Sequence, residues 1–255
     1  MSLVSLSGLI RVAVTSMDYV DLTLPSPQEN LACDEAFLDC REREGGAEIL
    51  RVWEPLGHFV VLGYANRAAS EVNLEACRRR GIPVLRRCSG GGTVLQGPGC
   101  LNYSLLLNVE RRSVLQSITE TNCSILKCNA AMASALLGRS AAIQGFTDLT
   151  IGNLKFSGNA QRRKRHWILF HGTFLLDFDT ALMEELLLVP PKQPAYRQNR
   201  SHRQFLTRVD VSVHSIKAAL RECWAATQLL QKIPSSLIAQ LIREKYSRDE
   251  WNLKW

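Results

Sequence analysis

Apolar residues recur at helical spacing in several separate stretches of the chain. In residues 28–43, Leu31, Phe37 and Leu38 share one side of a helix that begins after the Pro25-Ser26-Pro27 turn. The same spacing predicts further helices over residues 74–80, 114–137, 180–188, 213–230 and 235–246. Helices are therefore expected along the whole chain, including its C-terminal part.

Between these helices lie short runs of apolar and β-branched residues, which are typical of strands. They cover residues 48–53, 59–63, 83–87, 101–107 and 167–176. Residues 149–157 predict a hairpin with Gly152-Asn153 as its turn. Because strands and helices are mixed rather than strictly alternating, we expect an α/β (α+β) fold with a mixed β-sheet flanked by helices. No repeat or low-complexity linker interrupts the pattern, so residues 1–255 are predicted to form a single domain.

The composition is that of a globular protein, with 46% hydrophobic and 22% charged residues among 255. No apolar run approaches the ~18 residues of a membrane span. The N-terminus has no apolar core followed by a small-residue cleavage site, so a signal peptide is not expected. We therefore predict a cytoplasmic protein without a membrane partner.

The net charge of +7 comes from basic residues that occur in clumps. They lie in residues 78–80, 86–87, 162–165 and 197–203. Such a charge suits nucleic acid, anionic small molecules or an acidic protein partner. Aromatic residues are not interleaved with the clumps, as stacking of single-stranded bases would require, so we expect no nucleic-acid partner. Residues 196–203 are too rich in Arg, Asn and Ser for a core, but their role does not follow from the sequence.

The cysteines show neither C-x-x-C pairs nor a histidine at zinc-finger spacing. They are Cys33, Cys40, Cys77, Cys88, Cys100, Cys123, Cys128 and Cys223. In a long chain without an export signal, buried thiols are the favoured interpretation for most of them. Cys33 and Cys40 are a heptad apart on the first predicted helix and are expected to face the core.

A glycine-rich loop follows the short strand that ends at Leu85. Its sequence is Arg86-Arg87-Cys88-Ser89-Gly90-Gly91-Gly92-Thr93. Three glycines remove every Cβ that would keep a ligand from the backbone, and the two arginines add fixed positive charge. The loop has neither the G-K-[ST] ending of a Walker loop nor the following helix of a dinucleotide-binding fingerprint. A tight turn that needs glycine only for its geometry is the alternative interpretation.

Lys155 follows the predicted hairpin turn, and strand alternation places it on the opposite face from Leu154 and Phe156. Most strand lysines are simply solvated on an exposed face. Here the small residues of the stretch 157–160 come directly afterwards and would allow a ligand to approach closely. Lys155 is therefore a candidate for contact with a ligand.

These two motifs resemble the signature of lipoate–protein ligases, which share a superfamily with biotin ligases and octanoyl transferases. The resemblance includes residues 86–104, Thr147-Asp148, residues 155–161 and His171-Gly172-Thr173, and extends over about residues 28–210. It implies the biotin/lipoate ligase type of catalytic domain. The Gly-Arg-Gly-Arg signature of biotin ligases is missing, and we expect no separate C-terminal accessory domain of the kind that two-domain ligases carry.

The resemblance also implies roles for individual residues. Lys155 would be catalytic, by neutralising the α-phosphate and polarising the acyl carbonyl. Asp148 would contact the adenylate or its Mg²⁺, and His171 would shape the site rather than transfer protons. The implied substrate and adenylate-binding set is Arg86, Arg87, Ser89, Gly90, Gly91, Gly92, Thr93, Asn102, Asp148, Ser157, Gly158 and His171. Gln96 stands where many of these ligases carry a histidine.

The implied reaction uses ATP and Mg²⁺ to convert lipoate (or octanoate) to an acyl-adenylate. The acyl group then passes to a lysine of a lipoyl-bearing acceptor, such as a lipoyl domain or an H-protein-like carrier. One alternative is an octanoyl or lipoyl transferase without its own adenylation step, and another is a non-catalytic protein that binds lipoyl domains. A cysteine-dependent transferase is disfavoured, because none occurs between Asn129 and Glu222. The adenylation step could alternatively rely on a separate accessory subunit.

Overall fold

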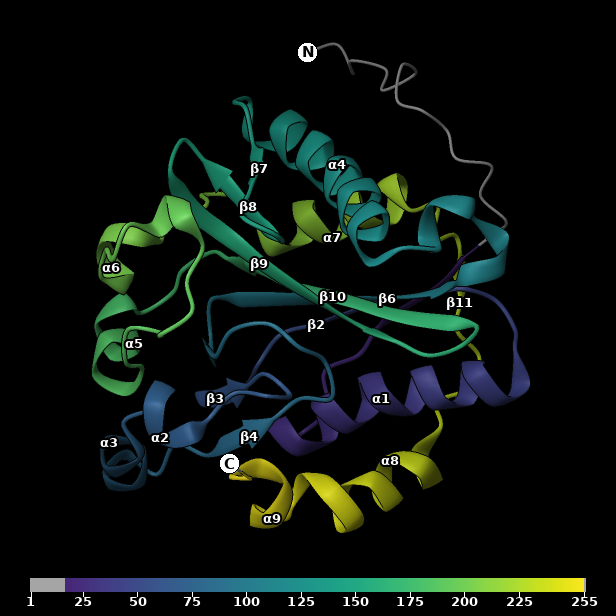
Figure 1. The fold of residues 1–255 in the computed structure, drawn as a ribbon. Coiled ribbons are helices and arrows are strands. Elements are labelled where there is room, and N and C mark those ends of the chain that lie inside the picture. The colour runs from purple at the N-terminus through teal and green to yellow at the C-terminus, as the bar shows by residue number, and fades with distance from the viewer. Residues whose placement is uncertain (1–16, 255) are drawn as a thin grey trace.

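The computed structural model describes residues 17–254, and it confirms the predicted mixed α/β fold. An eight-stranded sheet in the order β11-β1-β2-β6-β10-β9-β8-β7 forms the centre, with helices on both faces (Figure 1). Its strands are β1 (Asp18–Asp21), β2 (Ile49–Trp53), β6 (Cys100–Asn108), β7 (Ala142–Gln144), β8 (Asp148–Ile151), β9 (Leu154–Arg163), β10 (Trp167–Leu175) and β11 (Gln228–Leu229). β1 is parallel to β2 and β11, and the other neighbours are antiparallel. The N-terminal segment on which the signal-peptide expectation rests lies outside the described residues.

A second, three-stranded sheet lies on one side of the large one and carries the strand that leads into the glycine loop. It has the order β4-β3-β5, formed by β3 (Phe59–Leu62), β4 (Val84–Arg86) and β5 (Val94–Gln96). β3 is parallel to β4 and antiparallel to β5. The glycine loop therefore joins the two outer strands of this small sheet.

The helices agree closely with the apolar spacing. They are α1 (Pro27–Glu44), α2 (Ala68–Glu71), α3 (Leu74–Arg80), α4 (Ile118–Leu137), α5 (Thr180–Leu186), α6 (His202–Phe205), α7 (Val213–Cys223), α8 (Ser235–Leu241) and α9 (Asp249–Asn252), with a π-helical turn at Ile242–Tyr246. Short 3-10 turns lie at Val109–Arg111, Ser113–Leu115 and Ala195–Arg197. α1 begins with a capping box between Ser26 and Glu29, which explains its well-defined start. Within residues 17–254, no helix is long and apolar enough to cross a membrane.

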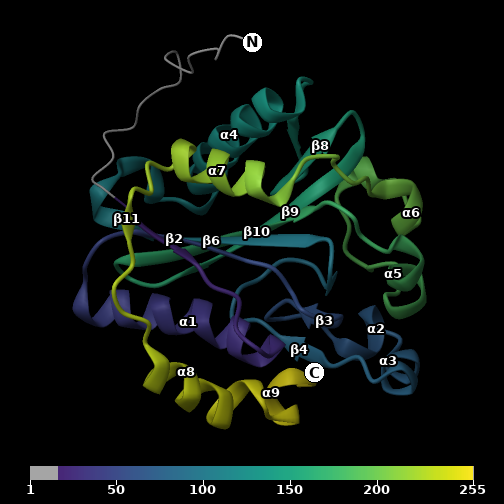
Figure 2. The same cartoon turned by 180° about the vertical axis from the view of Figure 1, so that it is seen from behind.

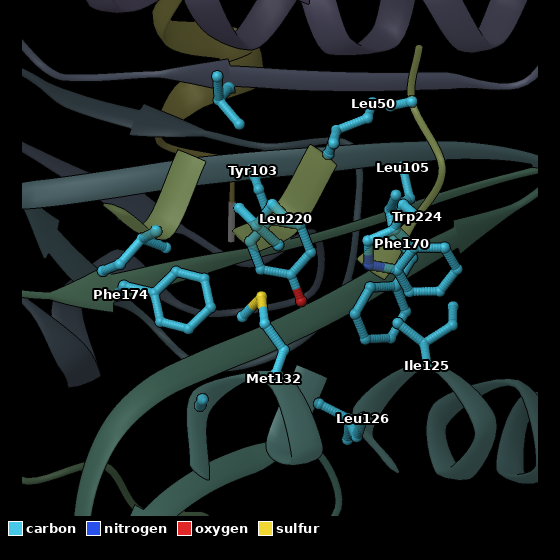
Figure 3. Close-up of a cluster of buried hydrophobic side chains, with 14 of the residues drawn as sticks. Leu50, Tyr103, Leu105, Ile125, Leu126, Met132, Phe170, Phe174, Leu220 and Trp224 are labelled. Carbon is cyan, nitrogen blue, oxygen red and sulfur yellow. The ribbon is translucent and has the colours of Figure 1, made fainter. Parts of the chain in front are cut away.

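Three groups of buried apolar side chains fill the space between these layers. One lies between the large sheet and the pair α4 and α7, where residues such as Tyr103, Phe170 and Leu220 meet (Figure 3). A second lies under α1, with α8 beyond it, and the third joins the small sheet to α3 and α5. Seen from behind, α7 and α1 cover opposite faces of the large sheet (Figure 2). The second and third groups border the space between the two sheets.

The predicted helix over 213–230 is wrong in its second half. α7 ends at Cys223, and Ala225 takes a left-handed backbone conformation with φ of 48°. The chain then forms β11, whose residues Gln228 and Leu229 pair with Asp18 and Tyr19 of β1. Local apolar spacing predicted a helix here, but pairing with the distant strand β1 stabilises an extended conformation instead.

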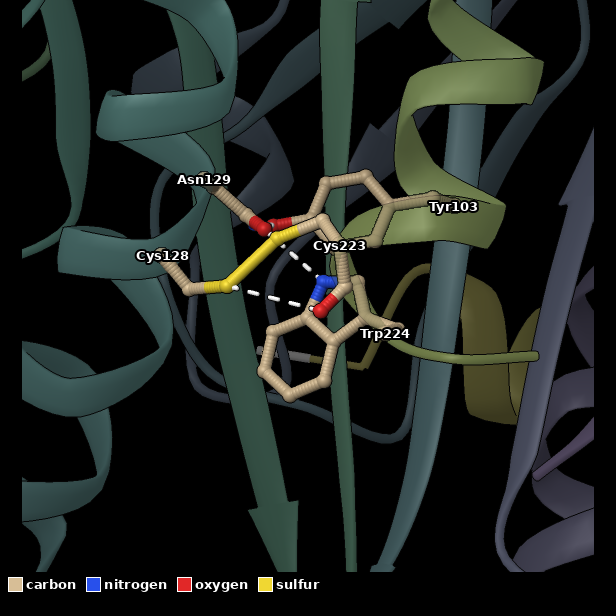
Figure 4. The surroundings of a disulfide bond; sticks show 5 residues. All are labelled: Tyr103, Cys128, Asn129, Cys223 and Trp224. Atoms are coloured by element: carbon tan, nitrogen blue, oxygen red, sulfur yellow. Dashed lines mark hydrogen bonds between the residues drawn. A yellow bond between two sulfur atoms is a disulfide. The ribbon is translucent and has the colours of Figure 1, made fainter. Parts of the chain in front are cut away.

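The expectation of buried thiols holds for some of the cysteines but not for all. Cys128 of α4 and Cys223 of α7 are joined by a disulfide (Figure 4). Cys123 is exposed and Cys40 is only half-buried, so the prediction that Cys40 faces the core is wrong. Cys33 of the same helix is buried, as predicted.

A hydrogen-bonded chain runs beside this disulfide from α7 into the large sheet. The indole Nε1 of Trp224 donates to Oδ1 of Asn129, and Nδ2 of Asn129 donates to the hydroxyl of Tyr103. That hydroxyl donates to Oδ1 of Asn159, whose Nδ2 reaches the carbonyl of Thr147. The α4–α7 layer is thereby connected to the segment that precedes β8.

Arg86, at the end of β4, anchors the C-terminal segment to the small sheet. Its buried guanidinium donates to the carbonyl oxygens of Trp251 and Lys254, at 3.0 and 2.8 Å. It also donates to the carbonyls of Gly63 and Asn66 in the loop after β3, at 2.9 and 2.7 Å. One buried cation thus holds two distant backbone segments together.

Replacing Arg86 by methionine should lower the free energy of unfolding by about 3 kcal/mol, because several carbonyls would lose a charged donor at once. Urea unfolding followed by fluorescence would measure this loss. Arg78→Met, at an exposed position of α3, should stay within about 0.5 kcal/mol. Equal effects of the two substitutions would contradict the anchoring role.

Candidate functional site

A cavity of about 400 Å³ lies between the two sheets. Its floor follows one row of paired residues across the large sheet, from Asp148 through Gly158, Thr173 and Asn102 to Trp53. This row crosses four strand spacings, or roughly 19 Å. The cavity is therefore elongated, with Asp148 at one end of the row and Trp53 at the other.

The two ends of the cavity differ in character. Around Trp53 the lining includes the apolar side chains of Leu31 and Val61, which belong to the same buried group. At the other end, the lining includes the charged side chains of Lys155 and Arg197. An apolar compartment with a cationic end suits a ligand that has a hydrocarbon chain and an anionic head.

Arg87 fixes the conformation of the glycine loop from inside. Its guanidinium donates to the carbonyl oxygen of Gly90, at 2.6 Å from Nη2, and to that of Gly92, at 2.8 Å. Gly91 has φ of 87°, and a Cβ there would lie 2.8 Å from Nη2 of Arg87, so only glycine fits. Burial lowers the pKa of Arg87 to about 10, which still leaves it protonated at neutral pH.

Ser89 connects this loop to β10. Its hydroxyl lies 2.6 Å from Nε2 of His171, and Nε of Arg87 donates to the same hydroxyl at 3.1 Å. Burial, with a smaller contribution from the charge of Arg87, lowers the pKa of His171 to about 4. His171 is therefore a neutral imidazole near pH 7, which agrees with a role in shaping the cavity.

Lys155 is not a solvated hairpin lysine. Its Nζ lies 2.8 Å from Oδ1 of Asp148, and the hydroxyl of Tyr196 donates to Oδ2 of Asp148 at 2.7 Å. The lysine side chain is only 22% exposed. A Cβ on Gly158 would come within 2.7 Å of Nζ, so glycine at 158 leaves the space that the lysine head occupies.

Most of the residues proposed from the sequence meet at this cavity. Those that line it are Arg87, Gly91, Gly92, Thr93, Asn102, Asp148, Lys155, Gly158 and His171. Ser89 and Gly90 lie just behind the lining, where His171 and Arg87 bind them. Ser157 is buried, and its hydroxyl has no hydrogen-bond partner among the described residues.

Arg86 is the exception, because the structure does not bring it to the cavity. Successive residues at a strand end point to opposite sides, and Arg87 takes the side that faces the cavity. The guanidinium of Arg86 is bound instead by the backbone carbonyls described above. The expectation that both arginines line the ligand pocket is thus wrong for Arg86.

The expected magnesium site at Asp148 lacks further acidic partners. Within residues 17–254, no group of three or more His, Cys, Asp or Glu side chains is arranged to hold a metal ion. The two oxygens of Asp148 already bind Lys155 and Tyr196. The expected contact of Asp148 with magnesium therefore stays a prediction.

Asn102, which the sequence placed in the binding set, bonds with Gln96 and Thr173 in a closed ring of side chains. Other residues of the site were not expected from the sequence. The segment 188–206 contributes Tyr196 to the site and Arg197 to the lining, and Phe146 lies at the mouth with 87% exposure. The only signal in the sequence was the polar and basic composition of residues 196–203.

Comparison with known proteins identifies the family. Residues 26–234 match the family model described as the lipoyl protein ligase A/B catalytic domain, so the chain belongs to this family. This confirms the resemblance seen in the two sequence motifs. The match begins just before α1 and ends before α8.

Two relatives show the range of activities within the family. An octanoyltransferase LipM from Brevibacillus brevis is 28% identical, over 92% of this chain and 98% of the relative. A putative lipoate-protein ligase A from Aeropyrum pernix is 30% identical, over 81% of this chain and 74% of the relative. The family membership therefore does not distinguish a ligase from a transferase.

Solved structures share the whole fold. One is a bi-partite lipoate protein ligase from Thermoplasma acidophilum, described together with its E2 lipoyl domain. Its TM-score is 0.76 at 26% sequence identity, and the alignment covers 93% of this chain and 96% of that chain. A lipoate-protein ligase A bound with ATP gives 0.77 at 25% identity and covers 94% and 99%. The mixed sheet and its helices are thus those of lipoate-protein ligases.

Acidification should destabilise the protein as the pH falls from about 6.5 towards about 4. Burial lowers the pKa of His202 to about 4, as it does for His171, so the unfolded chain takes up protons in this range and the folded chain does not. His171→Gln should weaken this pH dependence by on the order of 2 kcal/mol. Urea unfolding at a series of pH values would measure it.

The matched control is His214→Gln, at an exposed position of α7. This substitution should leave the pH dependence of the unfolding free energy unchanged. A profile for His171→Gln that coincides with that of His214→Gln would show that folding does not lower the pKa of His171.

Proposed function

We propose that this chain is a lipoate–protein ligase. It would use Mg-ATP to convert lipoate (or octanoate) to an acyl-adenylate, and then transfer the acyl group to a lysine of a lipoyl-bearing acceptor. The observation that carries this proposal is the cavity itself: the amine of Lys155 lies in it beside Asp148, whereas none of its described lining residues is a cysteine.

The geometry around Lys155 suits both steps. In the first, the lipoate carboxylate attacks the α-phosphorus of ATP, and pyrophosphate leaves. In the second, the ε-amine of the acceptor lysine attacks the acyl carbonyl, and AMP leaves. An ammonium group fixed by Asp148 stabilises the negative charge that develops on phosphate and carbonyl oxygens in the transition states.

The rival function is octanoyl or lipoyl transfer without adenylation, which the LipM relatives favour because they match nearly the full length of the chain. A thioester route needs an accessible thiolate. Cys88, the thiol within the glycine loop, is buried, and burial raises its pKa to about 12. A transferase that accepts an already activated acyl group without a cysteine is therefore the second candidate.

ATP use and the partners follow by analogy. The ATP-bound ligase with the same fold supports a nucleotide site in this cavity. The bi-partite archaeal ligase supports an acceptor with a lipoyl domain, and also a separately encoded subunit for the activation step. We further propose that residues 1–255 act as one catalytic domain and that the protein works in the cytoplasm.

Intact-mass spectrometry of a purified lipoyl-bearing acceptor would test the proposal. One sample contains the protein with lipoate and Mg-ATP, and a second contains pre-made lipoyl-adenylate. A lipoyl mass shift in both samples supports a self-sufficient ligase. A shift only with the adenylate supports the second candidate or a missing subunit. No shift and no pyrophosphate release, while a control ligase modifies the same acceptor, would leave only a binding protein.

Lys155→Met should reduce acyl transfer to the acceptor by a factor of about 100 or more, because one electrostatic contact to a developing oxyanion has this magnitude. The rate of transfer from lipoyl-adenylate would be measured. Lys164→Met removes a lysine that is similarly paired, with Asp39, but on the loop between β9 and β10. Comparable rates in these two variants would contradict the catalytic role of Lys155.

Tyr196→Phe should slow transfer roughly tenfold or more, since a hydrogen bond to a charged group contributes about 1.5 kcal/mol or more and here holds the Asp148–Lys155 pair in position. The KM for lipoate should change little. Tyr246→Phe is the matched control, because it also removes a hydroxyl that donates to a carboxylate, that of Glu35, outside the cavity. If both variants transfer at the wild-type rate, Tyr196 has no positioning role.

A further inference from the structure

A chain of buried polar side chains leads from the α4–α7 layer to the segment that carries Asp148. This polar chain consists of Trp224, Asn129, Tyr103 and Asn159, none of which is more than 8% exposed. The hydrogen bonds that join them measure 3.0, 2.7 and 2.7 Å in this order. Polar groups cost free energy to bury unless they are fully hydrogen-bonded, and apolar side chains would fill the same core without that cost. The polar chain is therefore expected to have a role besides packing.

The indole of Trp224 sets the direction of the polar chain. Because an indole nitrogen can only donate, it requires the oxygen of the Asn129 amide, and the amide nitrogen then donates to the hydroxyl of Tyr103. That hydroxyl donates to Oδ1 of Asn159. The side-chain nitrogen of Asn159 is thereby directed at the carbonyl of Thr147.

The outer end of the polar chain is fixed by a covalent bond. Cys128 directly precedes Asn129 in α4, and Cys223 directly precedes Trp224 at the end of α7. The disulfide between the two cysteines lies beside the first hydrogen bond of the chain (Figure 4). α4 and α7 are thus tied together where the polar chain begins.

At its inner end the polar chain holds Thr147, the residue before β8. Nδ2 of Asn159 donates to the carbonyl of Thr147 at 2.7 Å, and the hydroxyl of Thr147 donates to the carbonyl of Asn159 at 2.7 Å. Gly172 lies between Asn159 and Tyr103 in one row of paired residues. A Cβ on Gly172 would overlap Oδ1 of Asn159, so glycine leaves the space in which the two side chains meet.

This attachment determines the position of Asp148. Asp148 is paired with Gly158 on β9, directly beside the reciprocal bonds between Thr147 and Asn159. From there its Oδ1 lies 2.8 Å from Nζ of Lys155. Misplacing a group in an active site by about 1 Å can reduce the rate by a factor of about 100. A shift of Thr147 would therefore impair the ion pair.

We propose that Asn159 is a positioning residue for acyl transfer, which directs the Asp148 carboxylate towards Lys155 by holding Thr147. Tyr103 and Asn129 orient the amide of Asn159 from the α4–α7 side. The inference rests on the proposed function. It assigns a role in the reaction to side chains of α4, which lies on the face of the large sheet opposite α1.

Tyr103→Phe tests this role, because it removes only the hydroxyl in the middle of the polar chain. The kcat for transfer from lipoyl-adenylate should fall roughly fivefold, the effect of about 1 kcal/mol, with KM changed less than twofold. In the Lys155→Met background the same substitution should have no further effect, since no amine is left to position. Ile125→Val, a control in the same apolar core, should lose about 1 kcal/mol of stability but keep the wild-type kcat.

The reactivity of Lys155 supplies a readout that does not depend on catalysis. Trace labelling with acetic anhydride, followed by peptide mass spectrometry, measures the rate at which each lysine is acetylated. Tyr103→Phe should raise the rate at Lys155 roughly threefold or more, because a loosened ion pair protects the amine less. Lys164, which is paired with Asp39 at 2.6 Å, is the internal control and should react at its wild-type rate.

Three results would overturn the inference. One is wild-type labelling of Lys155 in Tyr103→Phe. Another is an equal rise of this labelling in Ile125→Val, which would indicate general loosening of the core. The third is a loss of kcat that persists in full in the Lys155→Met background. Wild-type protein that transfers no acyl group would instead contradict the proposed function, and the labelling of Lys155 would then decide the positioning role by itself.

Discussion

The pairing of Lys155 with Asp148 is the interaction around which the cavity is organised. The carboxylate sits on β8 and the lysine on β9, so the ion pair closes the hairpin between them across the sheet. Tyr196 adds the second contact to Asp148 from a loop that lies far along the chain. Because a carboxylate with little exposure needs compensating charge, these three residues constrain one another's positions. Because Gly158 has no side chain, the amine of Lys155 can lie close to the sheet.

Several buried arginine side chains in this region are stabilised by different kinds of contact. Arg86 and Arg87 are adjacent in sequence, yet one binds the carbonyls of the C-terminal segment and the other those of the glycine loop. Both are satisfied by the chain itself and therefore act as structural supports. Arg197 is the buried arginine whose Nη2 has no partner within residues 17–254.

The family contains both ligases and transferases on one scaffold, so the fold does not decide between them. The side chains that line the cavity are the relevant evidence on whether the reaction uses a cysteine. Transfer through a thioester needs a reactive thiolate, and the described wall offers an amine, guanidinium groups and amides. Cys33 and Cys100, like Cys88, have pKa values that burial raises to about 12, which is unfavourable for a nucleophile. Our proposal of an adenylate-forming ligase rests on these groups of the described wall.

The sequence by itself determined the elements that depend on near neighbours. The apolar spacing after the Pro25-Ser26-Pro27 turn, the hairpin turn at Gly152 and the glycine loop are local patterns, and they predicted α1, the β8–β9 hairpin and one wall of the cavity. The motif resemblance added Lys155 and Asp148. Only the tertiary structure decided which way Arg86 and Arg87 point, since strand alternation says that they diverge but not which one faces the ligand. It also decided that residues 228–229 join β1, that α4 and α7 share a disulfide, and that the loop at 196–197 reaches Asp148. These features depend on contacts between segments far apart in the chain, which short-range periodicity does not encode.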